Sequence, residues 1–438
     1  MKILFLCLLL VVPVFAANHY VLDGGSGDGS AWNNAWDVLP GTLTRGDTYY
    51  VGDGTYALYN CDTTEDGTNI ITIKKAIESD HGTETGWSSA YGDGSAVWGE
   101  IIFSTDYWVL DGQVRDADWL AGYGFTFQGG NKVINLSWNS LPADNVTIRY
   151  VSITGTGPDD AAGSNDGIYV INSQTNVYLG YSRISDVGRV QILARGLKNF
   201  ICEYNYIDRN ENYTGQHSEA VSLFSGTVSN CVFRYNKWVD IEGTGVIVVG
   251  DAIDCKFYGN VIYWTTNYPY AGQQGSYVGN GSITCWTDNT LTNASIYNNT
   301  LIIPETGGVN YRLGDVGGAA TNNVATNNLI FCSGTIGSRF GYTSTTAHDY
   351  NAYSGGNSES EANEQTNITS AIFTDVDTYD FTLVSGTDAG ITLGAEFATD
   401  LLGITRSIDG TWDRGAYEYG AWPVNPDVPP NRLWIGVP

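Results

Sequence analysis

A nine-residue phrase, NVTIRYVSI at 145–153, decides the fold of this chain because it recurs six more times. Successive copies begin 31, 23, 31, 24, 39 and 29 residues apart, and apolar residues alternate inside each copy. A constant strand between loops of unequal length is typical of β-solenoid rungs, whereas ankyrin repeats keep one length. The other copies are NVYLGYSRI at 176, NFICEYNYI at 199, NCVFRYNKW at 230, DCKFYGNVI at 254, NASIYNNTL at 293 and NNVATNNLI at 322.

The seventh residue of five consecutive copies is asparagine. A bend between two strands needs a residue that tolerates the left-handed region of backbone space, and Asn does so. Its amide can also hydrogen-bond to the Asn of the next rung, about 4.8 Å away. We therefore expect an asparagine ladder that forms the bend, made of Asn205, Asn236, Asn260, Asn299 and Asn328.

A second apolar strand precedes each phrase. Crossovers between parallel strands are right-handed in nearly all proteins. The sequence therefore predicts an all-β fold, a single-stranded, right-handed parallel β-helix. The core positions expected in the second strand are Ile168 and Val170, Val190 and Ile192, Val221 and Leu223, Val246 and Val248, and Ile283 and Cys285.

One β-helix domain is expected over residues 17–420, since solenoids grow by stacking and escape the usual limit on domain size. Residues 18–130 would hold an N-terminal cap and the first rungs. Residues 345–420 would hold the last rungs and a closing segment. Residues 421–438 carry five prolines and are expected to be an extended tail.

Residues 1–16 are expected to be an export signal, so we predict a secreted protein. Lys2 precedes an apolar run at 3–15, and Val14 and Ala16 supply the small residues of a cleavage site. The run is shorter than the roughly 20 residues of a membrane span. A net charge of −27 with 20 Lys plus Arg argues against nucleic acid and anionic membranes as partners, because both favour a basic face.

Six cysteines remain once the signal is removed, too few for a disulfide-built scaffold of this length. Cys231 and Cys255 take the second place of their phrases and Cys202 the fourth, which is the same side of a strand. We expect them to be buried thiols of a narrow core. A disulfide between neighbouring rungs and a metal site remain as alternatives.

Two segments resemble secreted bacterial proteins of the pectin-lyase-like β-helix group. Residues 46–56 (GDTYYVGDGTY) with Ile71-Thr72-Ile73-Lys74 are similar to the opening of the polysaccharide lyase family that contains chondroitinase B and alginate lyases. The resemblance implies an extracellular polysaccharide as partner. The second segment is similar to a closing segment of uncharacterised members, at Phe373, Asp375, Asp380-Phe381-Thr382-Leu383, Asp400, Gly403, Arg406 and Gly415-Ala416-Tyr417-Glu418.

The lyase resemblance implies paired Glu residues that bind Ca²⁺, a following Lys base and an Arg on the next rung. Here the corresponding stretch, residues 217–224 (HSEAVSLF), aligns one Glu and has no Lys, and residues 245–249 have no Arg. Asn165-Asp166-Gly167-Ile168 resembles a stretch of polygalacturonases that carries a catalytic Asp. Their following Asp pair is replaced by residues 187–190 (VGRV).

A line of polar side chains is expected just before the second strands of four consecutive rungs. We predict catalytic roles for Asp166, Asp186, Arg189, His217 and Glu219. Asp166 and Glu219, two rungs or about 9.6 Å apart, suit an inverting acid and base. Stacked carboxylates can also bind Ca²⁺, for which Glu219 and Glu242 are the candidates. The alternative is an ordinary row of solvated turn acids.

The 39-residue step contains a long loop with four aromatic residues that could stack on sugar rings. These candidate substrate-binding residues are Trp264, Tyr268, Tyr270 and Tyr277, and the alternative is a loop folded onto the solenoid surface. Three functions remain open at this point. They are a polysaccharide lyase or glycoside hydrolase, a non-catalytic glycan-binding surface protein, and a structural protein that self-associates into filaments.

Overall fold

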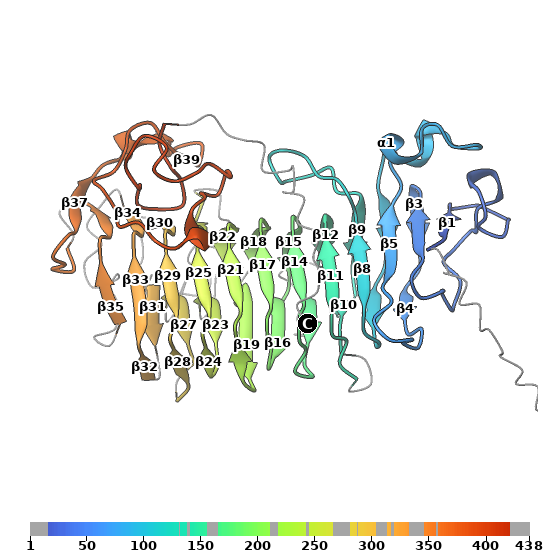
Figure 1. Ribbon diagram of the computed structural model, residues 1–438, viewed down its shortest axis with the longest axis horizontal. Helices are drawn as coiled ribbons and strands as arrows, with labels where there is room; N and C mark the ends of the chain where they lie inside the picture. The colour runs from blue at the N-terminus through green and yellow to red at the C-terminus, as the bar shows by residue number, and fades with distance from the viewer. Residues whose placement is uncertain are drawn as a thin grey trace, which may run out of the picture.

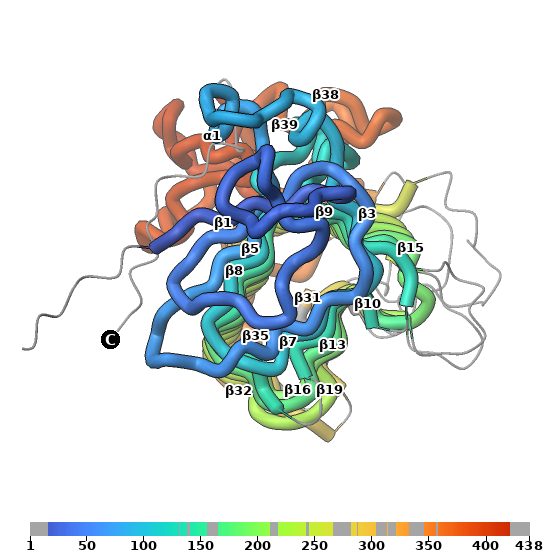
Figure 2. The backbone as a smooth tube through the Cα atoms, turned by 90° about the vertical axis from the view of Figure 1, so that its right-hand side faces the viewer, coloured from blue at the N-terminus to red at the C-terminus, as the bar shows by residue number. Residues whose placement is uncertain are grey.

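The computed structural model describes residues 16–130, 132–137, 141–155, 165–210, 218–241, 245–265, 281–286, 288–303, 313–316, 319–332, 346–355 and 358–420. In these ranges the chain forms three long parallel sheets of twelve, nine and twelve strands. Figure 1 shows the strands of successive rungs side by side along the length of the molecule. Figure 2 looks down the axis from the N-terminal end, and the coil winds clockwise as it recedes, so the predicted right-handed β-helix is confirmed.

Each turn of the coil passes through sheet A, then sheet B, then sheet C. Sheet A contains β1 (Asn18–Val21), β2 (Thr48–Val51), β5 (Ile71–Lys75), β8 (Trp108–Asp111), β11 (Val146–Arg149), β14 (Tyr178–Gly180), β17 (Ile201–Glu203), β21 (Val232–Arg234), β25 (Lys256–Tyr258), β29 (Ser295–Tyr297), β33 (Asn323–Thr326) and β35 (Thr346–Asp349). Sheet B contains β3 (Gly54–Tyr56), β6 (Ala96–Trp98), β9 (Phe125–Gln128), β12 (Val151–Thr154), β15 (Arg183–Val187), β18 (Tyr206–Asn210), β22 (Lys237–Ile241), β26 (Val261–Tyr263), β30 (Thr300–Ile303), β34 (Leu329–Cys332), β36 (Ala352–Ser354) and β37 (Gln365–Ile368).

The third side of the coil is sheet C, with β4 (Tyr59–Cys61), β7 (Ile101–Phe103), β10 (Lys132–Asn135), β13 (Asp166–Val170), β16 (Val190–Arg195), β19 (Val221–Ser225), β23 (Gly245–Val249), β27 (Gly281–Cys285) and β31 (Leu313–Val316). A short fourth sheet follows it in the later rungs, with β20 (Val228–Ser229), β24 (Ala252–Ile253), β28 (Thr290–Thr292) and β32 (Ala319–Thr321). One short helix, α1 (Glu78–His81), lies near the N-terminal end. Among the described residues, no helix has the length and apolar character needed to cross a membrane.

The predicted asparagine ladder is confirmed at the bend between sheets A and B. Asn260 is typical: its Nδ2 donates to Asn299 Oδ1 at 3.0 Å, and its Oδ1 accepts from Asn236 Nδ2 at 3.1 Å. The same Oδ1 also accepts the backbone N–H of Asn236 at 3.1 Å. The ladder continues to Asn351, whose Oδ1 accepts from Asn328 Nδ2 at 3.0 Å.

The prediction that these asparagines themselves take the left-handed backbone is wrong. The residue before each one does so, with φ of 55° at Tyr204, 57° at Tyr235 and 64° at Gly259. The ladder amide must point inward to reach its neighbours, so the preceding residue makes the bend. A second left-handed column lies at the first place of the phrases, for example at Asn199 and Asn230, both with φ of 53°.

The interior is a continuous apolar column, and the six cysteines from Cys61 to Cys332 are all free and buried. The expected core thiols are thereby confirmed. Cys231 and Cys255 lie on neighbouring rungs, where Lys256 N donates to Cys231 O at 2.8 Å. The neighbouring Cys255 thiol, and after it burial, raise the pKa of Cys231 well above the ordinary range.

The expected register is wrong at two rungs of sheet C. Ile168 aligns with Ile192 rather than Val190, and Val221 aligns with Ile247 rather than Val246. At the second of these rungs the reason is a break in the alternation where the chain enters this sheet. Val246 and Ile247 are consecutive, fully buried, and both part of the core.

The closing segment folds back over the outside of the coil instead of ending it. Figure 1 shows this orange-red segment lying over sheet B from β37 back to β22. It includes the antiparallel pair β38 (Phe373–Asp375) and β39 (Asp380–Leu383). Its buried aromatic residues form a second apolar cluster with the outer face of sheet B. Sheet B contributes Val239, Val261, Tyr263 and Phe331 to this cluster, and the closing segment contributes Phe373, Phe381, Phe397, Trp412 and Tyr417.

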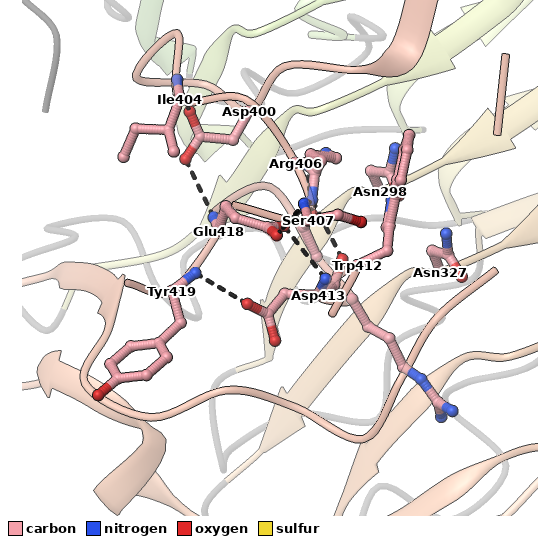
Figure 3. Close-up of polar contacts among 12 residues, drawn as sticks. Asn298, Asn327, Asp400, Ile404, Arg406, Ser407, Trp412, Asp413, Glu418 and Tyr419 are labelled. Atoms are coloured by element: carbon pink, nitrogen blue, oxygen red, sulfur yellow. Dashed lines mark hydrogen bonds and ion pairs between the residues drawn. The ribbon is translucent and has the colours of Figure 1, made fainter. Parts of the chain in front are cut away.

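A buried set of charged groups holds the closing segment together, as Figure 3 shows. Asp400 accepts the backbone N–H of Glu418 at 3.0 Å, and Asp413 accepts that of Tyr419 at 2.8 Å. The Glu418 carboxylate accepts the N–H of Asp413 at 3.1 Å and faces Arg406 at 3.5 Å. Burial raises the pKa of Glu418 to about 7, against the opposing effect of Arg406.

We predict that Asn260→Ala lowers the free energy of unfolding by about 3 kcal/mol, because buried groups lose their partners. These include the N–H of Asn236, the indole N–H of Trp238 and the carbonyl of Phe233. Chemical denaturation measures the change, with the exposed Asn69→Ala as control. Equal stability of the two variants would contradict the ladder's role.

We also predict that the closing segment loosens as pH rises through neutrality. The pKa of Glu418 is about 7 when folded and near its ordinary 4.5 when unfolded, so the folded state holds the proton more tightly. Its contribution is fully present below about 4.5 and is lost as pH passes 7. Limited proteolysis and thermal unfolding between about pH 5.5 and 8.5 measure this loss of stability, which should be smaller in Glu418→Gln than in the unsubstituted protein. An equal dependence of stability on pH in the two proteins would contradict the prediction.

Candidate functional site

Two of the predicted acids share one column at the start of sheet C. Asp166 aligns with Val190, and the next pair, Ile192 with Val221, places Val190 opposite Glu219. Asp166 and Glu219 are therefore two rungs apart, a separation of about 9.6 Å. Both carboxyl side chains are fully buried. The predicted spacing rests on this register.

Arg189 joins the column from the turn before β16. Its Nε donates to Asp166 Oδ1 at 2.8 Å, and a second guanidinium nitrogen contacts Oδ2. The Arg189 side chain is 27% exposed, whereas that of Asp166 is 0% exposed. Burial lowers the pKa of Arg189, but Asp166, Tyr169 and Glu219 together outweigh it and raise the pKa. Both carboxyl groups of the column therefore contribute to the raised pKa of Arg189.

The pKa of Asp166 is set by opposing effects and lies slightly below neutrality. Burial raises its pKa to about 6, while Arg189 and Lys132 act in the opposite direction. Lys132 is the register partner of Asp166 on the preceding rung, and its Nζ lies 3.9 Å from the ring centre of Tyr169. Asp166 can therefore bind and release a proton in the mildly acidic range, as a general acid must.

Two buried amides that the sequence analysis missed brace this column. Asn210 Nδ2 donates to the carbonyls of Arg189 at 3.0 Å and Glu219 at 2.7 Å, so it ties two rungs together. Gln191 Nε2 donates to the carbonyl of Asp208 at 2.9 Å. Both amides are fully buried, and their oxygens accept no hydrogen bond from the described residues. The sequence signal that could have identified these residues is an amide side chain that interrupts the apolar residues of a strand.

Asp186 lies in a different cluster. It takes a left-handed backbone with φ of 53°, at the end of β15, and its carboxylate pairs with Arg209 on the next rung. Arg209 also reaches Asp208 at 3.3 Å. Asp186 therefore does not join Asp166, Arg189 and Glu219, and its predicted catalytic role stays a prediction without support from this geometry.

The remaining candidates divide into described and undescribed residues. Trp264 is 7% exposed, belongs to the interior apolar cluster and donates its indole N–H to the carbonyl of Ile241 at 2.7 Å. A ring packed in this way leaves no face for a sugar, so the substrate-stacking expectation does not fit Trp264. Five other candidates lie outside the described residues, namely His217, Glu242, Tyr268, Tyr270 and Tyr277.

The side chains at this column can be compared with the expected calcium site. Within the described ranges, no three His, Cys, Asp or Glu side chains converge as a metal site. The positive charge next to Asp166 comes from Arg189, whose own pKa Glu219 also helps to raise. The described residues therefore do not form a cage of the roughly six to eight oxygens that Ca²⁺ takes. Calcium binding stays a prediction that depends on Glu242.

No protein-family model matches the chain, and no curated protein matches its sequence. Similar solved structures include pectate lyase Pel9A, with TM-score 0.42 and 14% identity over 93% of this chain and 98% of that one. A mannuronic acid specific polysaccharide family 6 lyase from human gut microbiota has TM-score 0.40 and 14% identity, over 81% of this chain and 82% of that one. The PL6 family alginate lyase AlyGC has TM-score 0.35 and 12% identity over 75% of this chain. The match spans about half, 51%, of the length of AlyGC. At these values the likenesses leave activity open.

We predict that Arg189→Gln raises the pKa of Asp166 above about 6, because the buried carboxylate loses its ion pair. Carboxyl-carbon NMR titration measures this pKa directly. Arg209→Gln is the matched control, since it removes the partner of Asp186 instead. The same Asp166 pKa in both variants would contradict the assigned pairing.

Proposed function

We propose that this protein is a secreted β-helix enzyme that hydrolyses an extracellular polysaccharide at the Asp166, Arg189 and Glu219 column. The observation that carries the proposal is the pair of buried carboxyls two rungs apart, with one partly exposed arginine beside them. The resemblance of the chain's opening to polysaccharide lyases supports the substrate class. The absence of the Lys and Arg of that family from the aligned stretches favours hydrolysis over elimination.

In the proposed reaction Asp166 is the acid and Glu219 the base. Asp166 gives its proton to the glycosidic oxygen as the bond to the anomeric carbon breaks. Glu219 takes a proton from a water molecule whose oxygen attacks that carbon from the opposite face. A separation of about 9.6 Å lies at the upper end of the range for an inverting acid and base. Arg189 positions Asp166 and holds its pKa down.

A second candidate is a glycan-binding protein without catalysis. It is favoured by the two-point contact between Arg189 and Asp166, which occupies both carboxylate oxygens. An arginine paired in this way favours the ionised carboxylate, so Asp166 carries a proton less of the time than an unpaired carboxyl would. Under this candidate Arg189, the partly exposed member of the column, would be the polar contact to the glycan. Removing its charges would then weaken binding without changing any covalent product.

The test is to incubate the protein with uronate-containing and neutral polysaccharides, with calcium and with a chelator. We expect new reducing ends without the absorbance of unsaturated products. Asp166→Asn and Glu219→Gln should each lower kcat about 10²-fold or more, the usual share of one acid or base. The control is Asp111→Asn, which removes another buried carboxylate, paired with Arg149 on sheet A.

Each other outcome has a definite meaning. Unsaturated products would replace hydrolysis by elimination. Full activity of both variants would move catalysis away from this column. No cleavage, together with glycan binding that both variants weaken, would establish the second candidate. Activity lost with the chelator and restored by calcium would support the Glu219 and Glu242 metal site.

A further inference from the structure

The first residues of the folded body converge on one buried carboxylate. The backbone nitrogen of Ala17 donates to Asp47 Oδ1 at 2.8 Å, and His19 Nε2 contacts Asp47 Oδ2 at 2.8 Å. Asp47 is 5% exposed. Both of its oxygens are thus used by two residues that lie at the start of the expected mature chain, within positions 17–19.

The position of Ala17 is fixed by its neighbours. Its carbonyl accepts the N–H of Thr48 at 3.0 Å, and β1 pairs with β2 from Asn18 and Thr48 onward. His19 stacks on Tyr49, with ring centres 4.7 Å apart, and on Trp36 at 5.3 Å. The nitrogen of Ala17 is therefore held against Asp47 by the sheet and by the aromatic stack.

The leader pattern places a cleavage point at this nitrogen. Ala16 is the last small residue after the apolar run, and both Ala16 and Ala17 are exposed. Hydrolysis of the bond between them adds water, leaves a carboxylate on Ala16 and frees the amino group of Ala17. In the precursor this nitrogen is a neutral amide with a single N–H. After cleavage it is an ammonium, whose three N–H groups can all donate.

We propose that removal of the leader after Ala16 creates an α-ammonium group that Asp47 binds as an ion pair, so that processing completes the anchor of the first strand. The charged or titratable neighbours of this group are Asp47, His19 and Tyr49. Arg45 does not compete, because its guanidinium is bound to the carbonyls of Thr63, Thr64, Asp106 and Tyr107 and to Thr105 Oγ1. An ion pair with a buried partner is stronger than the amide contact of the precursor.

The test begins with the secreted protein, whose mass and N-terminal sequence should begin at Ala17. The pKa of its α-amino group, followed by NMR after carbon-13 methylation, should lie about one pH unit above the ordinary range of roughly 7.7–8.0. Asp47→Asn should return it to that range. Asp62→Asn, which changes an exposed carboxylate, should leave it raised.

A second measurement covers the case in which Asp47→Asn does not fold. Acetylation of the Ala17 amine in the otherwise unchanged protein should lower the thermal midpoint, whereas a chain that keeps Ala16 should resemble the acetylated form. An amine pKa that is the same in the unsubstituted protein and in the Asp47→Asn variant would overturn the proposal. Cleavage at another bond, or a midpoint unaffected by acetylation, would also overturn it.

Discussion

The hydrogen bond from one ladder asparagine to the next is the constraint on which the rest of the structure depends. Each amide links neighbouring rungs and also satisfies backbone groups at the bend, as Asn299 does for the carbonyl of Phe257 at 2.9 Å. The rungs are thereby kept in register at one corner of the coil. Outside that corner, tyrosines stack with the same repeat: the ring centres of Tyr181 and Tyr204 are 5.1 Å apart.

Register at the corner determines which charges meet on the other sheets. Asp166 and Glu219 are 53 residues apart in the chain, yet they share a column because two full turns separate them. Asp186, nearer to Asp166 in sequence, is turned toward Arg209 by its left-handed backbone. The candidate site is therefore a product of strand alignment, and Arg189 pairs with Asp166 and opposes the rise that burial causes in the pKa of Asp166.

The repeated phrase was sufficient to predict the coil, the ladder and the buried thiols, because all three follow from residues at fixed places, and the hand followed from the general rule for parallel crossovers. The register of sheet C was not predictable, since Val246 and Ile247 both enter the core and break the alternation. The pairing of Arg189 with Asp166 was also missed. Sequence spacing gives the rung of a residue but not the direction of a long side chain. The fold-back of the closing segment depends on contacts between residues far apart in the chain, such as Trp412 with Asn298.

The most direct test of this account is a crystal structure of the Glu219→Gln variant with an oligosaccharide from the polysaccharide that the protein binds or cleaves. The account predicts a sugar bound across the start of sheet C, with its glycosidic oxygen near Asp166 and a ring oxygen or hydroxyl near Arg189. A sugar bound elsewhere, for example along the outer face of sheet A, with the column unchanged, would contradict it. In that case Asp166, Arg189 and Glu219 would be structural groups of the coil.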